Sequence, residues 1–351
     1  MGRNGRRNLG LVPDPINHID QCDDVWLSDV LGRAVAIADI EAVGVGVGLL
    51  GEVHRVVLDG DAGPPSVIVK LGAEANADIA VHFGYYEREW GAYRDLLPDS
   101  RVAAPGCWFN SLVDDRPCLV LEDLADHRRG DQVEGITPAD AEAAIDLAAD
   151  LHSGFWDDER LGSLSWMPGP EDPRVAGYGH LFEMMWDQFR TGAGVDVPSD
   201  VVDAARAAMA GFDAVVAGFG SPPVTVVHGD FRLDNLLFAP DGRAVAIDWQ
   251  LTARGRGPYD LAFLLAGSAT TDVRRELERV LIERYHARLV NRGVQDYPLE
   301  SCWDDYRRGH IQNLPNPVTA AVVVDPGNDR GRELLRRNAE RALTAVADLW
   351  G

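Results

Sequence analysis

Residues 224–264 read VTVVHGDFRLDNLLFAPDGRAVAIDWQLTARGRGPYDLAFL, and this stretch decides which fold the sequence predicts. Its centre is a predicted β-hairpin, because two short apolar runs, 236–238 and 245–247, flank Pro-Asp-Gly at 240–242. Asp-Gly between such runs is typical of a two-residue hairpin turn. We therefore expect an antiparallel ribbon that turns at this Asp-Gly pair.

With that turn, Asn235 and Asp248 would face each other across the ribbon, with Cβ atoms about 5 Å apart. One amide oxygen and one carboxylate at this spacing can hold Mg²⁺, which prefers oxygen ligands and keeps waters and substrate phosphates in its shell. Asp230 precedes them in a His-Gly-Asp sequence, and a carboxylate beside a metal site can act as a general base. The alternative is a common hairpin with solvated acids at its strand ends, and the hairpin alone leaves both interpretations open.

The length and composition limit the class of protein. With 351 residues the chain can form two lobes, and a hydrophobic content of 46% supports a packed core. The formal net charge of −23 argues against nucleic acid as a partner, because phosphate backbones are bound by Lys and Arg. This charge is compatible with a cationic substrate, although a high net charge more often only keeps a protein soluble.

The sequence also indicates where the protein works. The first residues do not form a signal-peptide pattern, and no apolar run approaches the ~18 residues of a membrane span. The four cysteines, Cys22, Cys107, Cys118 and Cys302, are scattered and form no CxxC pair. We therefore expect a reduced, cytoplasmic protein with neither a disulfide framework nor a zinc site, and without a membrane partner.

A glycine-rich segment lies near the N-terminus, where Gly46, Gly48 and Gly51 fit G-x-G-x-x-G-x-V. Alone this pattern is weak, because dinucleotide-binding and kinase folds both use it. In a dinucleotide-binding oxidoreductase a helix would follow the glycines. Here residues 52–58 alternate like a strand, and a Gly-Pro turn leads to a second strand at 67–70. We expect a glycine-tipped β-ribbon whose backbone amides approach phosphate oxygens, and rank the oxidoreductase low.

Lys70 is the single lysine among 33 basic residues, and it ends the second strand of this ribbon. A strand-end lysine is ordinarily exposed, but here it can add a positive charge to a phosphate site. A helix is predicted over 79–97, and Glu89 lies on its apolar stripe. Because a buried acid is costly unless it is paired, we expect an ion pair between Glu89 and Lys70. Glu87 is the rival, in a more solvated position.

We place the lobe boundary at residue 123, where the predicted elements change from strands to helices. Residues 1–123 are the predicted N-terminal nucleotide-binding lobe and residues 124–351 the C-terminal helical lobe. Thr137-Pro138 is a typical helix start, with an N-cap Thr and Pro at the first helical position, and this helix should run to about His152. Later helices are predicted at 178–190, 200–212, 259–265, 272–291, 299–314 and 332–350.

Six motifs now stand in order: GVGLLGEV, VIVK, Glu89 on a helix, LVLEDL, HGDFRLDN and IDWQ. Together they resemble the protein-kinase-like phosphotransferases of the aminoglycoside phosphotransferase and choline kinase superfamily. HGD in place of the protein kinases' HRD, and IDW in place of DFG, are typical of this small-molecule branch. HGDFRLDNLLF and VWLSDVL look most similar to the ecdysteroid-kinase-like group and its bacterial relatives.

The resemblance covers about residues 24–310 and implies a fold. This is an α+β, bilobal protein-kinase-like fold, with a small antiparallel β-sheet and one helix in the N-lobe and a larger, mainly helical C-lobe.

The resemblance also implies roles for site residues. In the N-lobe, Lys70, held by Glu89, would pair with the α- and β-phosphates of ATP. The remaining nucleotide-binding positions would be the loop glycines over the phosphates and the hinge backbone at the adenine edge, namely Gly46, Gly48, Gly51, Glu122, Asp123 and Leu124. In the C-lobe, Asp230 would accept or orient the proton of the substrate hydroxyl. Its neighbours would be the Mg²⁺ ligands and the supports of the catalytic loop, namely Asn235, Asp248, His228 and Asp260.

The implied function is an ATP- and Mg²⁺-dependent phosphotransferase that moves the γ-phosphate to a hydroxyl of a small molecule. GTP in place of ATP, the identity of the acceptor and the oligomeric state stay open. One alternative is a catalytically silent pseudokinase that only binds nucleotide. Another is an antibiotic-resistance kinase for aminoglycosides or macrolides, but many of these carry His two residues after the catalytic Asp, where this chain has Arg232.

Overall fold

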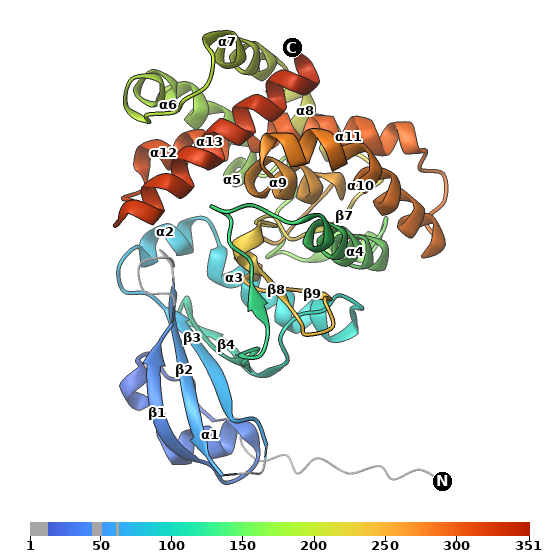
Figure 1. Ribbon diagram of the computed structural model, residues 1–351. Helices are drawn as coiled ribbons and strands as arrows, with labels where there is room; N and C mark the ends of the chain where they lie inside the picture. The colour runs from blue at the N-terminus through green and yellow to red at the C-terminus, as the bar shows by residue number, and fades with distance from the viewer. Residues whose placement is uncertain (1–12, 44–50, 61–62) are drawn as a thin grey trace. The chain divides into compact units, whose positions relative to one another are not determined.

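The computed structural model describes residues 13–43, 51–60 and 63–351. Contacts divide the chain into two compact units, shown in Figure 1. The first unit holds the chain up to Trp90 together with Pro105–Asp123, and the second holds Gly91–Ala104 and Leu124–Gly351. We describe each unit on its own.

The first unit is built on a five-stranded antiparallel sheet in the order β1-β2-β3-β5-β4. The strands are β1 (Ala36–Ala42), β2 (Gly51–Asp59), β3 (Ser66–Gly72), β4 (Cys107–Val113) and β5 (Arg116–Glu122). Strands β2 and β3 are the predicted ribbon, and β3 lies between β2 and β5. Because β3 is central, Lys70 is flanked on both sides, by Val53 of β2 and Leu119 of β5.

Helix α1 (Asp24–Leu31) packs against β1 and β4. The carboxylate of Asp23 caps it by accepting from the Trp26 N–H at 2.8 Å, and Gly32 ends it in the left-handed conformation. The apolar core of this unit joins the helix to the sheet, and it includes Leu27, Val56, Val67, Val69 and Val120. Burial of these side chains fixes the sheet from which Lys70 projects.

The continuous helix predicted over 79–97 is wrong. The segment forms α2 (Ala77–His82), α3 (Tyr85–Gly91) and a π-helical turn (Ala92–Leu96). Gly84, with φ of +69°, lies between α2 and α3 and turns the chain there. The boundary between the two units follows Trp90, so this helical segment contributes to both.

The second unit is mainly helical. Its helices are α4 (Pro138–Gly154), α5 (Pro173–Ala176), α6 (Tyr178–Gly192), α7 (Ser199–Ala208), α8 (Phe212–Phe219), α9 (Pro258–Ser268), α10 (Thr271–Asn291), α11 (Leu299–Asn313), α12 (Pro315–Val323) and α13 (Asp329–Trp350). The helix predicted over 200–212 is shorter than expected, because a 3₁₀ turn at Met209–Gly211 separates α7 from α8. As predicted, Thr137 caps α4, accepting from the Asp140 N–H at 3.2 Å.

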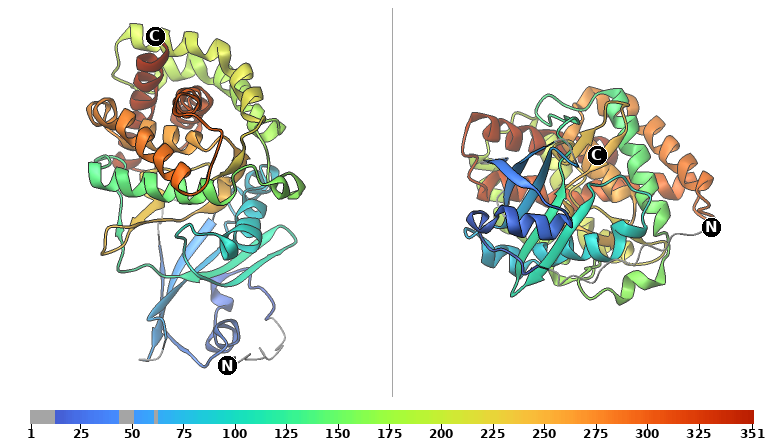
Figure 2. Two further views of the ribbon diagram at one scale, coloured as in Figure 1. Left: turned by 90° about the vertical axis from the view of Figure 1, so that its right-hand side faces the viewer. Right: turned by 90° about the horizontal axis from the view of Figure 1, so that it is seen from below.

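Helix packing gives this unit its core. Helix α10 packs on α4, α11 on α9, and α12 on α6, while α13, red in Figures 1 and 2, contacts α7, α9, α11 and α12. Phe182, Phe189, Phe219, Leu343 and Val346 are among the buried residues of this core. No helix among the described residues is both long and apolar enough to cross a lipid bilayer.

Short strands complete the second unit and carry the candidate site. Strand β7 (Thr225–Val227) pairs with β10 (Ala253–Gly255). Strand β8 (Leu236–Phe238) pairs with β9 (Ala244–Ala246) on one side and β6 (Arg128–Arg129) on the other. The predicted hairpin is thus β8–β9, and the His-Gly-Asp sequence directly follows β7.

Candidate active site

The hairpin has a different register from the predicted one. Leu236 pairs with Ala246, and the N–H of Ala239 donates to the carbonyl of Arg243 at 2.9 Å. The loop between them therefore has three residues, and its last one, Gly242, has φ of +85°. A three-residue hairpin loop with glycine in the left-handed region is a common alternative to the two-residue turn. The two-residue turn predicted from Asp-Gly was wrong.

The register change moves Asp248 by one position. Asn235 lies opposite Ile247, whose N–H donates to the Asn235 carbonyl at 3.0 Å, so the direct pairing predicted for Asn235 and Asp248 was also wrong. Asp248 follows with φ of +65°. A non-glycine residue in that region carries about 1–3 kcal/mol of strain and is found disproportionately at functional sites.

Asp230 is held between two side chains. The amide nitrogen of Asn235 donates to its Oδ2 at 2.7 Å and to its backbone carbonyl at 3.0 Å. The Nε of Arg232 lies 3.2 Å from both carboxylate oxygens. Since the Asn235 amide nitrogen faces two acceptors, its amide oxygen points elsewhere and remains available as a metal ligand.

Two carboxylates lie against the guanidinium of Arg232, Asp230 at 3.2 Å and Asp234 at 3.6 Å. The pKa of Arg232 is raised, most strongly by Asp230, next by Asp234 and less by Asp248. Asp230 contacts Asn235, and Asp248 directly follows Ile247, whose N–H is bonded to the Asn235 carbonyl. The structure thus brings Asp230, Asn235 and Asp248 to one end of the β8–β9 hairpin.

The loop that carries Asp230 is supported by a buried carboxylate. Asp260, at the start of α9, accepts the backbone N–H groups of His228 at 2.7 Å and Gly229 at 3.0 Å. The ring of His228 contacts the Ile247 carbonyl through Nε2 at 3.0 Å, so it ties this loop to the end of β9. Gly229 has φ of +83°, and a Cβ there would lie 2.1 Å from the Leu251 carbonyl oxygen.

The predicted phosphate-binding residues of the first unit are also paired. The Nζ of Lys70 lies 2.8 Å from the carboxylate of Glu89, on α3, and Glu89 is 3% exposed. The expected ion pair is therefore present. Gly51 is the first residue of β2, whereas Gly46 and Gly48 lie outside the described residues.

The predicted hinge follows β5. The Glu122 N–H donates to the Gly106 carbonyl at 2.7 Å. The carboxylate of Asp123 accepts from Arg55 and from the Ser66 hydroxyl, each at 2.6 Å. The carboxylate of Asp123 is therefore occupied inside the first unit. Leu124 begins the second unit.

Comparison with known proteins adds to this geometry. Residues 180–295 match the model of the Ecdysteroid kinase-like family, which is less than half of the chain. No curated protein sequence matches the chain. Solved structures do match: choline kinase LicA from Streptococcus pneumoniae has 17% sequence identity and a TM-score of 0.54, over 89% of this chain and 94% of that one.

Two aminoglycoside phosphotransferases match as well. The GDP complex of wild-type aminoglycoside 2'-phosphotransferase-IIIa is 14% identical, with a TM-score of 0.54 over 87% of this chain and 93% of that one. A thermostable mutant of the phosphotransferase APH(4)-Ia, in a ternary complex with ADP and hygromycin B, is 12% identical, with a TM-score of 0.50 over 92% and 98%.

This chain has a protein-kinase-like fold. The α+β architecture expected from the motifs is confirmed, and so is the resemblance to the aminoglycoside phosphotransferase and choline kinase superfamily. The roles that the motifs predict for the site residues described above remain proposals within this kinase-like fold.

Sequence reasoning missed one support of the loop that carries Asp230. His152, fully buried near the end of α4, contacts Asp260 through Nε2 at 3.1 Å and the Tyr285 hydroxyl through Nδ1 at 2.8 Å. A histidine on the apolar face of a capped helix was the signal available for it.

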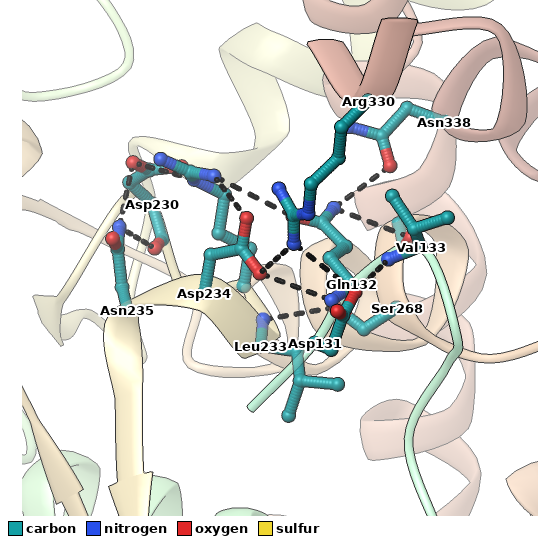
Figure 3. Close-up of polar contacts among 12 residues, drawn as sticks. Asp131, Gln132, Val133, Asp230, Leu233, Asp234, Asn235, Ser268, Arg330 and Asn338 are labelled. Carbon is teal, nitrogen blue, oxygen red and sulfur yellow. Dashed lines mark hydrogen bonds and ion pairs between the residues drawn. The ribbon is translucent and has the colours of Figure 1, made fainter. Parts of the chain in front are cut away.

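A second group of polar residues was also missed. Asp234 accepts the Gln132 N–H at 3.0 Å, and the Gln132 side chain donates to Asn338 of α13 at 2.7 Å, as Figure 3 shows. Leu233 donates its N–H to the Ser268 hydroxyl at 3.0 Å. The segment before the hairpin is therefore fastened to α9 and, through Gln132, to α13. Single residues far apart in the sequence carry these bonds, so no local motif indicates them.

Proposed function

We propose that this protein transfers the γ-phosphate of a purine nucleoside triphosphate, ATP in the first instance, to a hydroxyl group of a small molecule. The observation that carries the proposal is the carboxylate of Asp230, held by Asn235 and Arg232 on a loop that Asp260 supports. Solved proteins of the same fold include phosphotransferases for small molecules.

Phosphoryl transfer depends mainly on positioning and on neutralising charge. The acceptor oxygen forms a bond to the γ-phosphorus while the bond from that phosphorus to the β–γ bridging oxygen breaks. The electrons of the broken bond leave with the nucleoside diphosphate. The proton of the acceptor hydroxyl goes to Asp230, whose carboxylate still has lone pairs free beside its contacts to Asn235 and Arg232.

The residues at the end of the hairpin fit Mg²⁺. Asn235 offers an amide oxygen and Asp248 a carboxylate, and Mg²⁺ usually combines one or two such ligands with substrate phosphates and water. Among the described residues no group of three or more His, Cys, Asp or Glu side chains is arranged to hold a metal ion. When bound, Mg²⁺ would supply positive charge against the phosphates of the nucleotide.

In the first unit, Lys70 would pair with the α- and β-phosphates, and its ion pair with Glu89 supports this role because the pair fixes the direction of the lysine side chain. The glycine loop of Gly46, Gly48 and Gly51 and the hinge backbone at 122–124 keep the roles predicted for them. One solved structure of similar fold holds GDP and another holds ADP. Both GTP and ATP therefore belong in the test.

The acceptor is a small molecule with a hydroxyl group, and we also propose a cytoplasmic location and neither nucleic acid nor membrane as partner. A catalytically silent nucleotide-binding protein is the competing function. An antibiotic-resistance kinase is a narrower version of the same activity, suggested by the aminoglycoside-phosphotransferase neighbours.

Calorimetry tests the metal and nucleotide parts of the proposal directly. We expect the wild type to bind ATP or GTP in the presence of Mg²⁺, and Asp248→Asn to weaken Mg²⁺-dependent binding by about tenfold, which corresponds to about 1.4 kcal/mol. Asp241→Asn, on the exposed hairpin loop, is the matched control and should bind like the wild type. No nucleotide binding with Mg²⁺, or equal binding by both variants, would contradict the proposal.

A further inference from the structure

The pair Asp-x-Arg occurs four times as a local contact in the described chain, at 158/160, 172/174, 230/232 and 241/243. In three of these pairs the backbone N–H of the arginine donates to the aspartate carboxylate, at 2.9 Å in 158/160, 2.9 Å in 172/174 and 3.1 Å in 241/243. In these three pairs the carboxylate accepts a backbone hydrogen bond within its own turn. Such short pairs are ordinary surface structure and contribute little to stability.

The pair Asp230/Arg232 is built differently. The Arg232 N–H donates to the backbone carbonyl of Asp230 at 2.9 Å and leaves the carboxylate free of this bond. Only Nε of the guanidinium contacts the carboxylate, at 3.2 Å from both oxygens. Its Nη1 turns away to Asp234 at 3.6 Å and to the Gln132 side-chain oxygen at 3.5 Å. Arg232 therefore joins Asp230 to a second set of residues.

That second set is fixed. Asp234 is 8% exposed, and the Gln132 N–H donates to it at 3.0 Å. Gln132 is itself almost fully buried and is held by α13, where Asn338 accepts its side-chain amide and Arg341 donates to its carbonyl at 2.7 Å. Figure 3 shows this chain of contacts from Asn338 through Gln132 to Asp234. Arg232 thus has a rigid support on the side away from Asp230.

We propose that Arg232 and Asp234 form a brace that orients the carboxylate of Asp230 toward the acceptor hydroxyl, anchored to α13 through Gln132. The inference rests on the proposed phosphotransferase function. The torsion that turns a carboxylate about its Cβ–Cγ bond has a broad, soft energy profile. Asn235 restrains one oxygen, and the Nε of Arg232, centred between both oxygens, restrains the remaining rotation. Arg232 is a positioning residue in this role, because it acts through Asp230.

The kinetic test compares Arg232→Met with Arg232→Lys and with Arg243→Met. Arg243 is the matched control, because its ion pair with Asp241 has the same spacing but lies on the exposed hairpin loop. For Arg232→Met we expect kcat to fall about 10- to 100-fold, the loss typical of a misplaced reacting group, while KM for the nucleotide changes less than about twofold. Arg232→Lys should recover part of kcat, and Arg243→Met should match the wild type.

A crystallographic arm tests the brace without any turnover. In Arg232→Met the Asp230 carboxylate should occupy more than one orientation, whereas in Arg243→Met it should keep one. A single unchanged orientation in Arg232→Met would overturn the inference, as would an unchanged kcat, or a loss of kcat accompanied by an equal change in nucleotide KM. If the wild type transfers no phosphate to any acceptor, the proposed function fails, and the orientation of Asp230 in the two crystals still decides the brace.

Discussion

At the scale of single residues, the loop that carries Asp230 contains a position where only glycine fits. Gly229 is such a position. Its φ is +83°, and a Cβ would lie 2.1 Å from the Leu251 carbonyl oxygen, a backbone atom that cannot rotate away. The neighbouring N–H groups are fixed by Asp260, so the loop cannot shift without losing those bonds.

Gly229→Ala should therefore displace the loop. We expect it to lower the free energy of unfolding by about 2–4 kcal/mol, from backbone strain and overpacking together, and to remove most phosphotransferase activity. Gly192→Ala is the control, since a Cβ at this helical glycine meets nothing within 4 Å. Urea unfolding and turnover measure both effects, and a Gly229→Ala protein as stable as Gly192→Ala would refute the argument.

His310 gives the protein a dependence on pH. It is buried on α11, neither ring nitrogen has a hydrogen-bond partner in the structure, and burial, aided by Arg274, lowers its pKa to about 3. An unfolded histidine titrates near pH 6.5. The stability contributed by the neutral, buried His310 is therefore complete above about pH 6.5. It is lost as the pH falls toward 3, at up to about 1.4 kcal/mol per pH unit.

His310→Leu should be less sensitive to acid than the wild type. We expect the difference in free energy of unfolding between pH 7 and pH 4.5 to be smaller in the variant by about 2–3 kcal/mol, since the depressed pKa costs the folded state about 1.4 kcal/mol for each pH unit below 6.5. Urea unfolding at the two pH values measures it. An identical pH dependence in both proteins would show that His310 does not titrate as the structure indicates.

Several of these residues were predictable from the sequence and others were not. Glu89 was predictable as the partner of Lys70, because an acid on an apolar stripe needs a cation and the chain has a single lysine. The hairpin register was not, because the left-handed conformation of Gly242 adds a residue to the loop. Gln132 and Asn338 lie far from Asp234 in sequence, so only the folded chain indicates that they support it.

At the scale of elements, an ion pair between Lys70 and Glu89 joins β3 to α3. Lys70 is 12% exposed and Glu89 is 3% exposed at the side chain. Removing one member of a buried pair leaves an uncompensated charge, which costs about 3–5 kcal/mol, whereas replacing both can be nearly neutral. The periodicity of the sequence predicted a helix carrying Glu89, but it missed the break at Gly84, where the chain turns with φ of +69°.

Lys70→Met should therefore destabilise the first unit more than the double variant Lys70→Met/Glu89→Gln does. We expect the double variant to recover at least about 1 kcal/mol of the loss in a double-mutant cycle, as coupled residues generally do. Thermal unfolding measures stability, and nucleotide titration measures the proposed phosphate contact, which both variants should weaken. Additive losses in the double variant would mean that the pair carries no coupling energy.

At the scale of the whole molecule, the order of the motifs predicted the fold better than any one of them. That order predicted a small antiparallel sheet, a mainly helical unit and a hairpin after His-Gly-Asp, and the structure contains all three. Sequence identity to solved proteins of this fold is only 12–17% for those compared. The net charge of −23 does not identify the acceptor, because it is a sum over the whole chain and describes no single site.

The central claim is that Asp230 takes the proton of an acceptor hydroxyl during phosphoryl transfer. The most direct measurement is mass spectrometry of products after incubation of the protein with ATP or GTP, Mg²⁺ and a broad panel of hydroxyl-bearing metabolites and antibiotics. The account predicts a phosphorylated product with the wild type and with Asp241→Asn, and at least about a hundredfold less with Asp230→Asn, as for loss of a general base. Equal product from Asp230→Asn, or none from the wild type across the panel despite nucleotide binding, would contradict it.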